Sequence, residues 1–268
     1  MNGNRVVYRL CPIVVLGVFL FSVPSALFAQ PGNVSAHVFP PNSEPFGLTY
    51  GEWGAKFWQW AFSLPATHHP SFDTTDCSTG QSGPVWFLSA KFCATVGPVV
   101  SPDCQAYAVV RSCQIPAGKA LLYAMANEDS FLEEPVGATE ATLRSNAKSL
   151  ADQAANVRFT VDGREVESVR ICSTGSACSP LQSPLFSYTL APDNVLAATG
   201  EYLHADQAPG LIPDGASSQG VNDGFFVLLA PLPVGRHTLV AHNTVPAYGL
   251  TFEVTYHLNV VPRVYGGD

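Results

Sequence analysis

The cysteines of this chain constrain its fold more than any other feature of the sequence. There are 7 cysteines, and setting aside Cys11, which lies in an N-terminal apolar segment, leaves an even number that suits a disulfide framework. Two extended apolar segments, residues 84–88 and 107–111, lie among the first four of them. Opposed positions of an antiparallel hairpin have residue numbers with a nearly constant sum, and two nested cysteine pairs around these segments fit that rule. We therefore predict a hairpin of the two segments and the disulfides Cys77–Cys113, Cys93–Cys104 and, by elimination, Cys172–Cys178.

An aromatic helix is predicted before this hairpin. Thr49 and Glu52 have the spacing of a capping box, and Pro65 cannot continue a helix. At 100° per residue, Trp53, Phe57 and Trp60 share one face, so the helix should lie across a sheet as a core element.

The remaining pattern is mostly that of short strands. An unbroken apolar run, residues 120–126, predicts a buried strand after the hairpin, and residues 139–155 have the spacing of a second helix. Asp162-Gly163 is typical of a tight hairpin turn, whereas residues 191–222 read as a long irregular loop. The other predicted strands are residues 157–161, 165–171, 186–190, 225–230, 236–241 and 250–261. We predict a mainly β fold: an antiparallel β-sandwich with a packed aromatic α-helix and one further helix, braced by disulfides.

The N-terminus has the features of a secretory signal peptide. Arg5 and Arg9 precede an apolar run that ends in small residues at Ala29. We therefore expect a signal peptide over residues 1–29, an extended arm over 30–45, and one compact β-rich domain over 46–268 with possible sub-units 46–156 and 157–268. The mature protein is expected in the periplasm or outside the cell, without a transmembrane segment. A formal net charge of −8 excludes nucleic acid as a partner.

The best candidate for chemistry is an acidic patch after the strand at residues 120–126. Glu128 and Asp129 should leave that strand directly, where two carboxylates can act as general acid and base or bind Ca²⁺. Glu133 and Glu134 follow after a short turn and are candidate binding residues. The alternative is a solvated acidic loop, or the first turn of a short helix, where acidic residues are favoured.

Two weaker candidates lie elsewhere in the chain. His68, His69 and Asp73 share one loop and can bind Zn²⁺ or form an acid/base pair, but their spacing matches no stereotyped metal motif, and the alternative, a plain polar loop, is favoured. Trp58 lies at the edge of the apolar face of the helix and is a candidate for stacking on a sugar. The alternative is that Trp58 is part of the core. The weakest candidates are His204, Asp206 and Asp223.

Four segments of the chain carry a resemblance to a known group of proteins. They are Gly80–Leu88, Arg111–Ala120, Pro231–Leu239 and Val254–Leu258. With the aromatic helix, they resemble a group of uncharacterised secreted bacterial proteins, which implies no activity. The segment Leu232–Leu239 also resembles the turn and strand of extracellular immunoglobulin-like domains, which implies only a fold for the C-terminal half.

These observations favour two classes of function. The first is non-catalytic binding of a small ligand or of an envelope or extracellular glycan. The alternative is a secreted hydrolase of a glycan or an ester, using either the acidic patch or the histidine loop.

Overall fold

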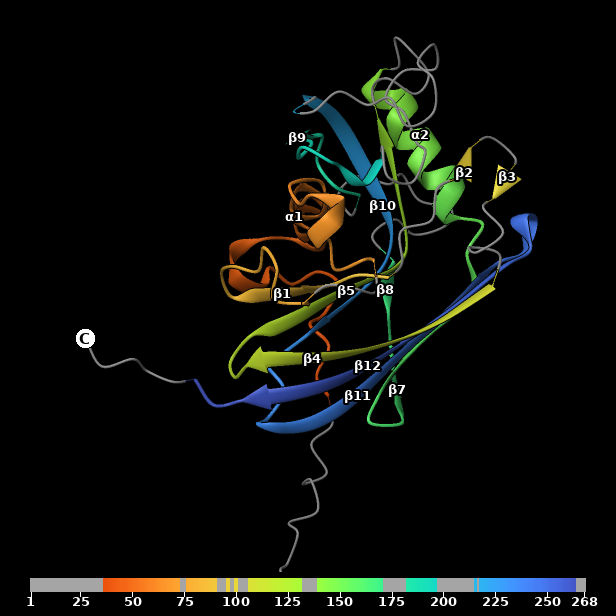
Figure 1. The fold of residues 1–268 in the computed structure, drawn as a ribbon. Helices are drawn as coiled ribbons and strands as arrows, with labels where there is room; N and C mark the ends of the chain where they lie inside the picture. The colour runs from red at the N-terminus through yellow and green to blue at the C-terminus, as the bar shows by residue number, and fades with distance from the viewer. Residues whose placement is uncertain are drawn as a thin grey trace, which may run out of the picture. The chain divides into compact units, whose positions relative to one another are not determined.

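Two five-stranded β-sheets and two α-helices form most of the described part of the chain (Figure 1). The structure is a computed structural model, in which Ser35–Asp268 form one compact unit. The described residues are 36–72, 76–90, 95–96, 99–100, 106–131, 139–170, 182–196, 215 and 217–263. The predicted signal peptide and the cysteines at positions 93, 104, 172 and 178 lie outside them.

The first sheet contains the apolar strand that follows the predicted hairpin. Its order is β1 (Val85–Leu88), β5 (Ala120–Phe131), β10 (Ser217–Leu229) and β8 (Val169–Arg170), and β9 (Phe186–Thr189) also pairs with β10. β1 runs parallel to β5, and the other pairs are antiparallel.

The second sheet is built largely from the C-terminal part of the chain. Its order is β4 (Ala106–Pro116), β12 (Leu250–Val261), β11 (Gly235–Val245), β6 (Ala155–Val161) and β7 (Arg164–Val166). β4 runs parallel to β12, and the other pairs are antiparallel. Two short strands, β2 (Thr95–Val96) and β3 (Val99–Val100), pair only with each other among the described residues.

The first sheet is the middle layer of the fold. Leu122, Ala124 and Leu228 belong to one core cluster with the aromatic residues of α1 (Tyr50–Phe62). Leu121 and Tyr123, their neighbours along β5, belong to a second cluster with residues of the other sheet. Because side chains of a strand alternate between two faces, α1 covers one face of the first sheet and the second sheet covers the other. The predicted mainly β sandwich with a packed aromatic helix is confirmed.

The local signals for helices are also confirmed. Thr49 and Glu52 form both halves of the capping box, with the Thr49 N–H donating to Glu52 Oε2 over 2.8 Å and the Glu52 N–H donating to Thr49 Oγ1 over 3.3 Å. The second helix, α2, spans Glu140–Ala151, and Leu143 and Ala147 on its apolar side are fully buried. Three short 3-10 helices complete the described elements: η1 (Pro45–Gly47), η2 (Ala66–His68) and η4 (Pro246–Tyr248).

The turn between β6 and β7 has the predicted form. Asp162 and Gly163 have φ angles of 51° and 76°, and Val161 pairs with Arg164, which leaves a two-residue loop. The strand predicted over residues 165–171 is divided, however. β7 ends at Val166 in the second sheet, and β8 pairs with β10 in the first.

The predicted hairpin is wrong, although the disulfide inferred from it is confirmed. Residues 84–88 and 107–111 fall in β1 and β4, which belong to different sheets and pair in parallel with β5 and β12. Cys77 and Cys113 are nevertheless bonded, with a Cα–Cα distance of 5.9 Å. The bond therefore joins the segment before β1 to a strand of the other sheet, and both sheets are mixed rather than purely antiparallel.

Several further boundaries differ from those predicted, and the second helix ends at Ala151 instead of residue 155. β5 continues to Phe131 instead of ending at residue 126, because β10 pairs with it as far as Phe131. β10 begins at Ser217, so the last part of the predicted loop over residues 191–222 is strand. Of the predicted arm, Val38 forms a bridge with Leu229 at the end of β10. Among the described residues, no helix is long and apolar enough to cross a membrane.

Candidate functional site

A cluster of buried polar side chains joins α2 to β10. Asp223 of β10 is 0% exposed, and its Oδ2 accepts a hydrogen bond of 3.3 Å from Gln182 Nε2. The same Gln182 amide also donates to the backbone carbonyl of Arg144 in α2 over 3.0 Å. Gln182 thus holds the buried carboxylate and the helix together through one amide group.

Arg144 completes this connection from the side of the helix. Its Nη1 donates to Gln182 Oε1 over 3.1 Å and to the Ser183 carbonyl over 3.0 Å. Its Nε and Nη2 donate to Glu140 Oε1 over 2.9 and 2.6 Å, one turn earlier in α2. The planar guanidinium therefore orients both the Gln182 side chain and the backbone beside it.

Asn222 and Ser183 extend the cluster along β10. The Asn222 N–H donates to Ser183 Oγ over 2.7 Å, and the Ser183 N–H donates to the Asn222 carbonyl over 3.1 Å. Both residues are 0% exposed. This pairing gives the segment after residue 181 a fixed place beside β10, where it continues the hydrogen bonding of β9.

The predicted acidic residues lie across from this cluster in the strand register. Glu128 is paired with Asp223, and Asp129 is paired with Asn222. The expectation that Glu128 and Asp129 leave the strand was wrong, since both are inside β5. Glu133 and Glu134 lie outside the described residues.

The histidine pair is divided between the surface and the core. His68 is exposed at the end of η2, whereas His69 is 0% exposed. The Ser71 N–H donates to His69 Nδ1 over 3.0 Å, and His69 Nε2 lies 2.9 Å from the Ala61 carbonyl oxygen. Because Nδ1 accepts and Nε2 faces an acceptor, these contacts require the neutral tautomer protonated at Nε2.

The environment of His69 agrees with a neutral ring. Burial, together with the positive charge of Arg111, lowers the pKa of His69 from 6.5 to about 4, against a smaller opposing effect of its bond to Ala61. Asp73, the third residue of the predicted metal site, lies outside the described residues. Among those described, no three His, Cys, Asp or Glu residues form a group able to hold a metal ion. The Ca²⁺ or Zn²⁺ site stays a prediction.

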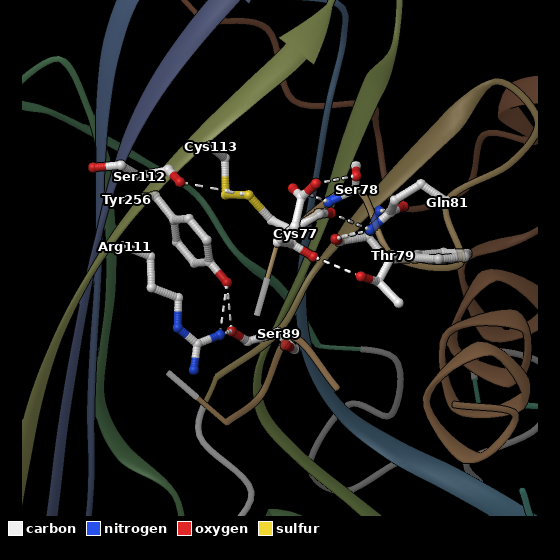
Figure 2. The surroundings of a disulfide bond; sticks show 11 residues. Cys77, Ser78, Thr79, Gln81, Ser89, Arg111, Ser112, Cys113 and Tyr256 are labelled. Carbon is white, nitrogen blue, oxygen red and sulfur yellow. Dashed lines mark hydrogen bonds between the residues drawn. A yellow bond between two sulfur atoms is a disulfide. The ribbon is translucent and has the colours of Figure 1, made fainter. Parts of the chain in front are cut away.

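Arg111 forms a polar connection between the two sheets beside the disulfide (Figure 2). Its Nη1 donates to the Ser89 carbonyl over 2.8 Å and to Tyr256 Oη over 3.1 Å, and its Nη2 donates to the Ser71 carbonyl over 3.0 Å. Tyr256 Oη in turn donates to the Ser89 carbonyl over 2.6 Å. Burial raises the pKa of Tyr256, so its hydroxyl stays protonated as this bond requires.

Trp58 lies in the core. It is 7% exposed and stacks at 5.1 Å between ring centroids on Phe62, while Phe57 meets it edge-on at 5.7 Å. The other three tryptophans are buried as well. The geometry therefore favours the core role of Trp58 over a sugar platform.

Few sequence features indicated the cluster around Asp223. The run Ser217–Gly224 is polar and contains two glycines, and Asn-Asp-Gly is typical of a turn. Gln182 and Ser183 had no pattern that pointed to them. Asp223 itself was only among the weakest candidates, and the apolar strand over residues 225–230, which pairing with β5 extends toward the N-terminus, was the other signal.

Comparisons with known proteins leave the family open. No protein family and no curated protein matches the chain. A chain from the structure of PbICP-C in complex with falcipain-2 aligns with 66% of this chain and 98% of its own length, at 8% identity and a TM-score of 0.24. At that TM-score the likeness carries no argument about fold or function.

Proposed function

We propose that this chain is an exported β-sandwich protein that binds a small ligand or an envelope or extracellular glycan without turning it over. Export is supported by the disulfide between Cys77 and Cys113, because such bonds form and persist in oxidising compartments. The signal-peptide pattern before residue 30 supports it independently.

The observation that supports binding over catalysis is the burial of Asp223 within a fixed set of hydrogen bonds. A catalytic carboxylate must reach the reacting group of its substrate. Asp223 is 0% exposed and accepts from Gln182, whose position Arg144 fixes. Such a carboxylate serves to position neighbouring elements, and strands and helices held in this way provide the rigid support that a binding surface needs.

Binding without turnover can be tested on the oxidised mature protein. The probes are soluble chito-oligosaccharides and cello-oligosaccharides, purified peptidoglycan, and a chromogenic acetyl ester. We expect a saturable rise in melting temperature with at least one carbohydrate and no release of reducing ends or chromophore. Product that increases in proportion to protein concentration would contradict the proposal, and so would the absence of any shift.

The alternative is a secreted hydrolase, and the register of β5 and β10 is the observation that favours it. Glu128 and Asp223 occupy opposed positions, and residues opposed across an antiparallel pair have Cβ atoms about 4.5–5.5 Å apart. Retaining glycosidases use a pair of carboxylic acid residues that flank the scissile bond, and opposed positions on neighbouring strands are one way to supply such a pair.

The hydrolase alternative predicts a different outcome from the same assays. If it holds, Glu128→Gln and Asp223→Asn should each abolish product release while the fold is kept. Glu253→Gln is the matched control, because Glu253 is an exposed acid on β12 of the second sheet. Turnover that survives both substitutions would exclude this pair as the catalytic groups.

A further inference from the structure

Phe46 is an exposed aromatic residue with an unusual backbone conformation. Its φ and ψ angles are 60° and 24°, in the left-handed region, and its side chain is 47% exposed. Bulky residues rarely adopt this conformation, which costs an L-residue about 1–2 kcal/mol relative to the right-handed form. Glycine or asparagine would adopt it more easily. Burial gives little compensation, because nearly half of the side chain stays in water.

The ring of Phe46 is braced by two other aromatic rings. Phe39 meets it edge-on at 6.0 Å between centroids and 73° between planes, and Trp53 does so at 6.3 Å and 87°. These are favourable geometries for aromatic pairs. The exposed ring is therefore held in one position at the surface.

The bracing rings are themselves anchored to the main elements of the fold. Trp53 of α1 donates from Nε1 to the Pro45 carbonyl over 3.0 Å, which fixes the backbone beside Phe46. Tyr50 Oη donates to the Phe39 carbonyl over 2.6 Å, and the Phe39 N–H donates to the Leu228 carbonyl of β10 over 2.9 Å. The aromatic surface made by Phe39 and Phe46 is thus rigidly attached to both α1 and β10.

The geometry points to the aromatic surface of Phe39 and Phe46 as the contact for an uncharged glycan, an inference that rests on the proposed function. A pyranose ring has an apolar C–H face that stacks on an aromatic ring, while its hydroxyl groups need polar partners. Asn42 and Glu44 are exposed in the same short segment and supply an amide and a carboxylate. A ring held in one position before binding lowers the entropy cost of binding.

Area and charge argue against other occupants. Phenylalanine buries at most about 150–250 Å², whereas a stable protein interface buries about 800 Å² on each partner. One exposed and one half-buried phenylalanine match one or two sugar rings much better than a second protein. Glu44 and Glu52 lie near the surface, and the chain carries a net charge of −8, which disfavours an anionic membrane or a nucleic acid.

The test uses three variants of the oxidised mature protein. Phe46→Asn removes the ring but suits the left-handed backbone, Phe46→Tyr keeps the ring, and Val110→Thr is the control. Val110 is 66% exposed on β4 of the second sheet. The probes are chito-oligosaccharides and cello-oligosaccharides measured by titration calorimetry, and purified peptidoglycan measured by co-sedimentation.

We expect the wild type, Phe46→Tyr and Val110→Thr to bind the same carbohydrate with similar affinity. Phe46→Asn should bind it about tenfold more weakly, which corresponds to about 1.4 kcal/mol, and its melting temperature should be equal to that of the wild type or higher. Equal affinity in Phe46→Asn would overturn this inference and leave the proposed function intact. If the wild type binds none of the probes, the proposed glycan binding fails and the inference fails with it.

Discussion

Cys77 and Cys113 connect the two sheets of the sandwich. Cys77 precedes β1 of the first sheet, and Cys113 lies within β4 of the second. β1 and β4 do not pair with each other, because β1 pairs with β5 and β4 pairs with β12. The bond therefore restrains a contact between layers, not between neighbouring strands.

The disulfide should contribute substantially to stability. Its cysteines are separated by 36 positions, and closing a loop of that size in the unfolded chain is worth on the order of 4 kcal/mol. We expect the free energy of unfolding of the double variant Cys77→Ala/Cys113→Ala to be lower than that of the wild type by a large part of this amount. Urea denaturation of the oxidised wild type and the double variant measures it. Equal denaturation midpoints would show that the bond adds no restraint.

Arg111 should stabilise the same region through its hydrogen bonds to Ser71, Ser89 and Tyr256. In Arg111→Met the carbonyls of Ser71 and Ser89 lose a charged donor, and we expect a loss of about 2–4 kcal/mol in the free energy of unfolding. Arg236→Met is the control, because Arg236 is exposed on β11.

The link from Arg111 to Tyr256 can be measured separately. Tyr256→Phe should cost about 1–2 kcal/mol, because the Ser89 carbonyl loses the phenol donor. A double-mutant cycle with Arg111→Met should give a non-zero coupling free energy, because the two side chains are hydrogen-bonded to each other at 3.1 Å. Strict additivity would mean that they act independently.

His69 should make the protein less stable in acid. Its pKa is about 4 in the folded state and 6.5 in the reference state, so the unfolded chain binds more protons between these values. Stability is therefore complete above about pH 6.5 and falls as the pH is lowered toward 4, by up to about 3 kcal/mol. Protonation would also break the bond that Nδ1 accepts from the Ser71 N–H.

Chemical denaturation at several pH values from 7 to about 4 checks this dependence. His69→Gln should flatten the profile, while His68→Gln should leave it unchanged because His68 is exposed. A wild-type profile without a decline over this range would contradict the expected role of His69.

Gln182 should contribute to the free energy of unfolding, although its side chain is neutral. In Gln182→Leu, Asp223 loses the hydrogen bond that it accepts from the Gln182 amide. Arg144 Nη1 loses Gln182 Oε1 as an acceptor and keeps the Ser183 carbonyl. We expect a loss of about 1–3 kcal/mol in the free energy of unfolding. Gln114→Leu is the matched control, because Gln114 is exposed on β4. Equal stability of both variants would remove the proposed positioning role of Gln182.

Local signals predicted the elements of this fold better than their partners. The capping box at Thr49, the Asp162-Gly163 turn and the strand over residues 250–261 depend on neighbouring residues, and each is confirmed. The hairpin between residues 84–88 and 107–111 was wrong because both strands pair with strands that come later in the chain. Apolar periodicity identifies a strand, but it does not identify which strand lies beside it.

The candidate site was predicted only in part for the same reason. Glu128 and Asp129 stood out as acidic residues after an apolar run, but pairing with β10 keeps them in the strand. Asp223 lies in a polar, glycine-containing segment that favours a turn, and tertiary pairing overrides that local preference. The exposed ring of Phe46 had no sequence signal, because its importance depends on a backbone angle.

The parallel pairing of β4 with β12 makes completion of the second sheet depend on residues 250–261. β12 is the last of the described strands in sequence, yet it lies between β4 and β11 in the second sheet. During synthesis, which starts at the N-terminus, β4 is made long before β12. β4 therefore cannot pair with β12 until Leu250–Val261 has been made. The pairs β11–β6 and β6–β7 do not need β12, so only the joining of β4 waits for it. A protein without Leu250–Val261 would lose the link between β4 and the rest of that sheet.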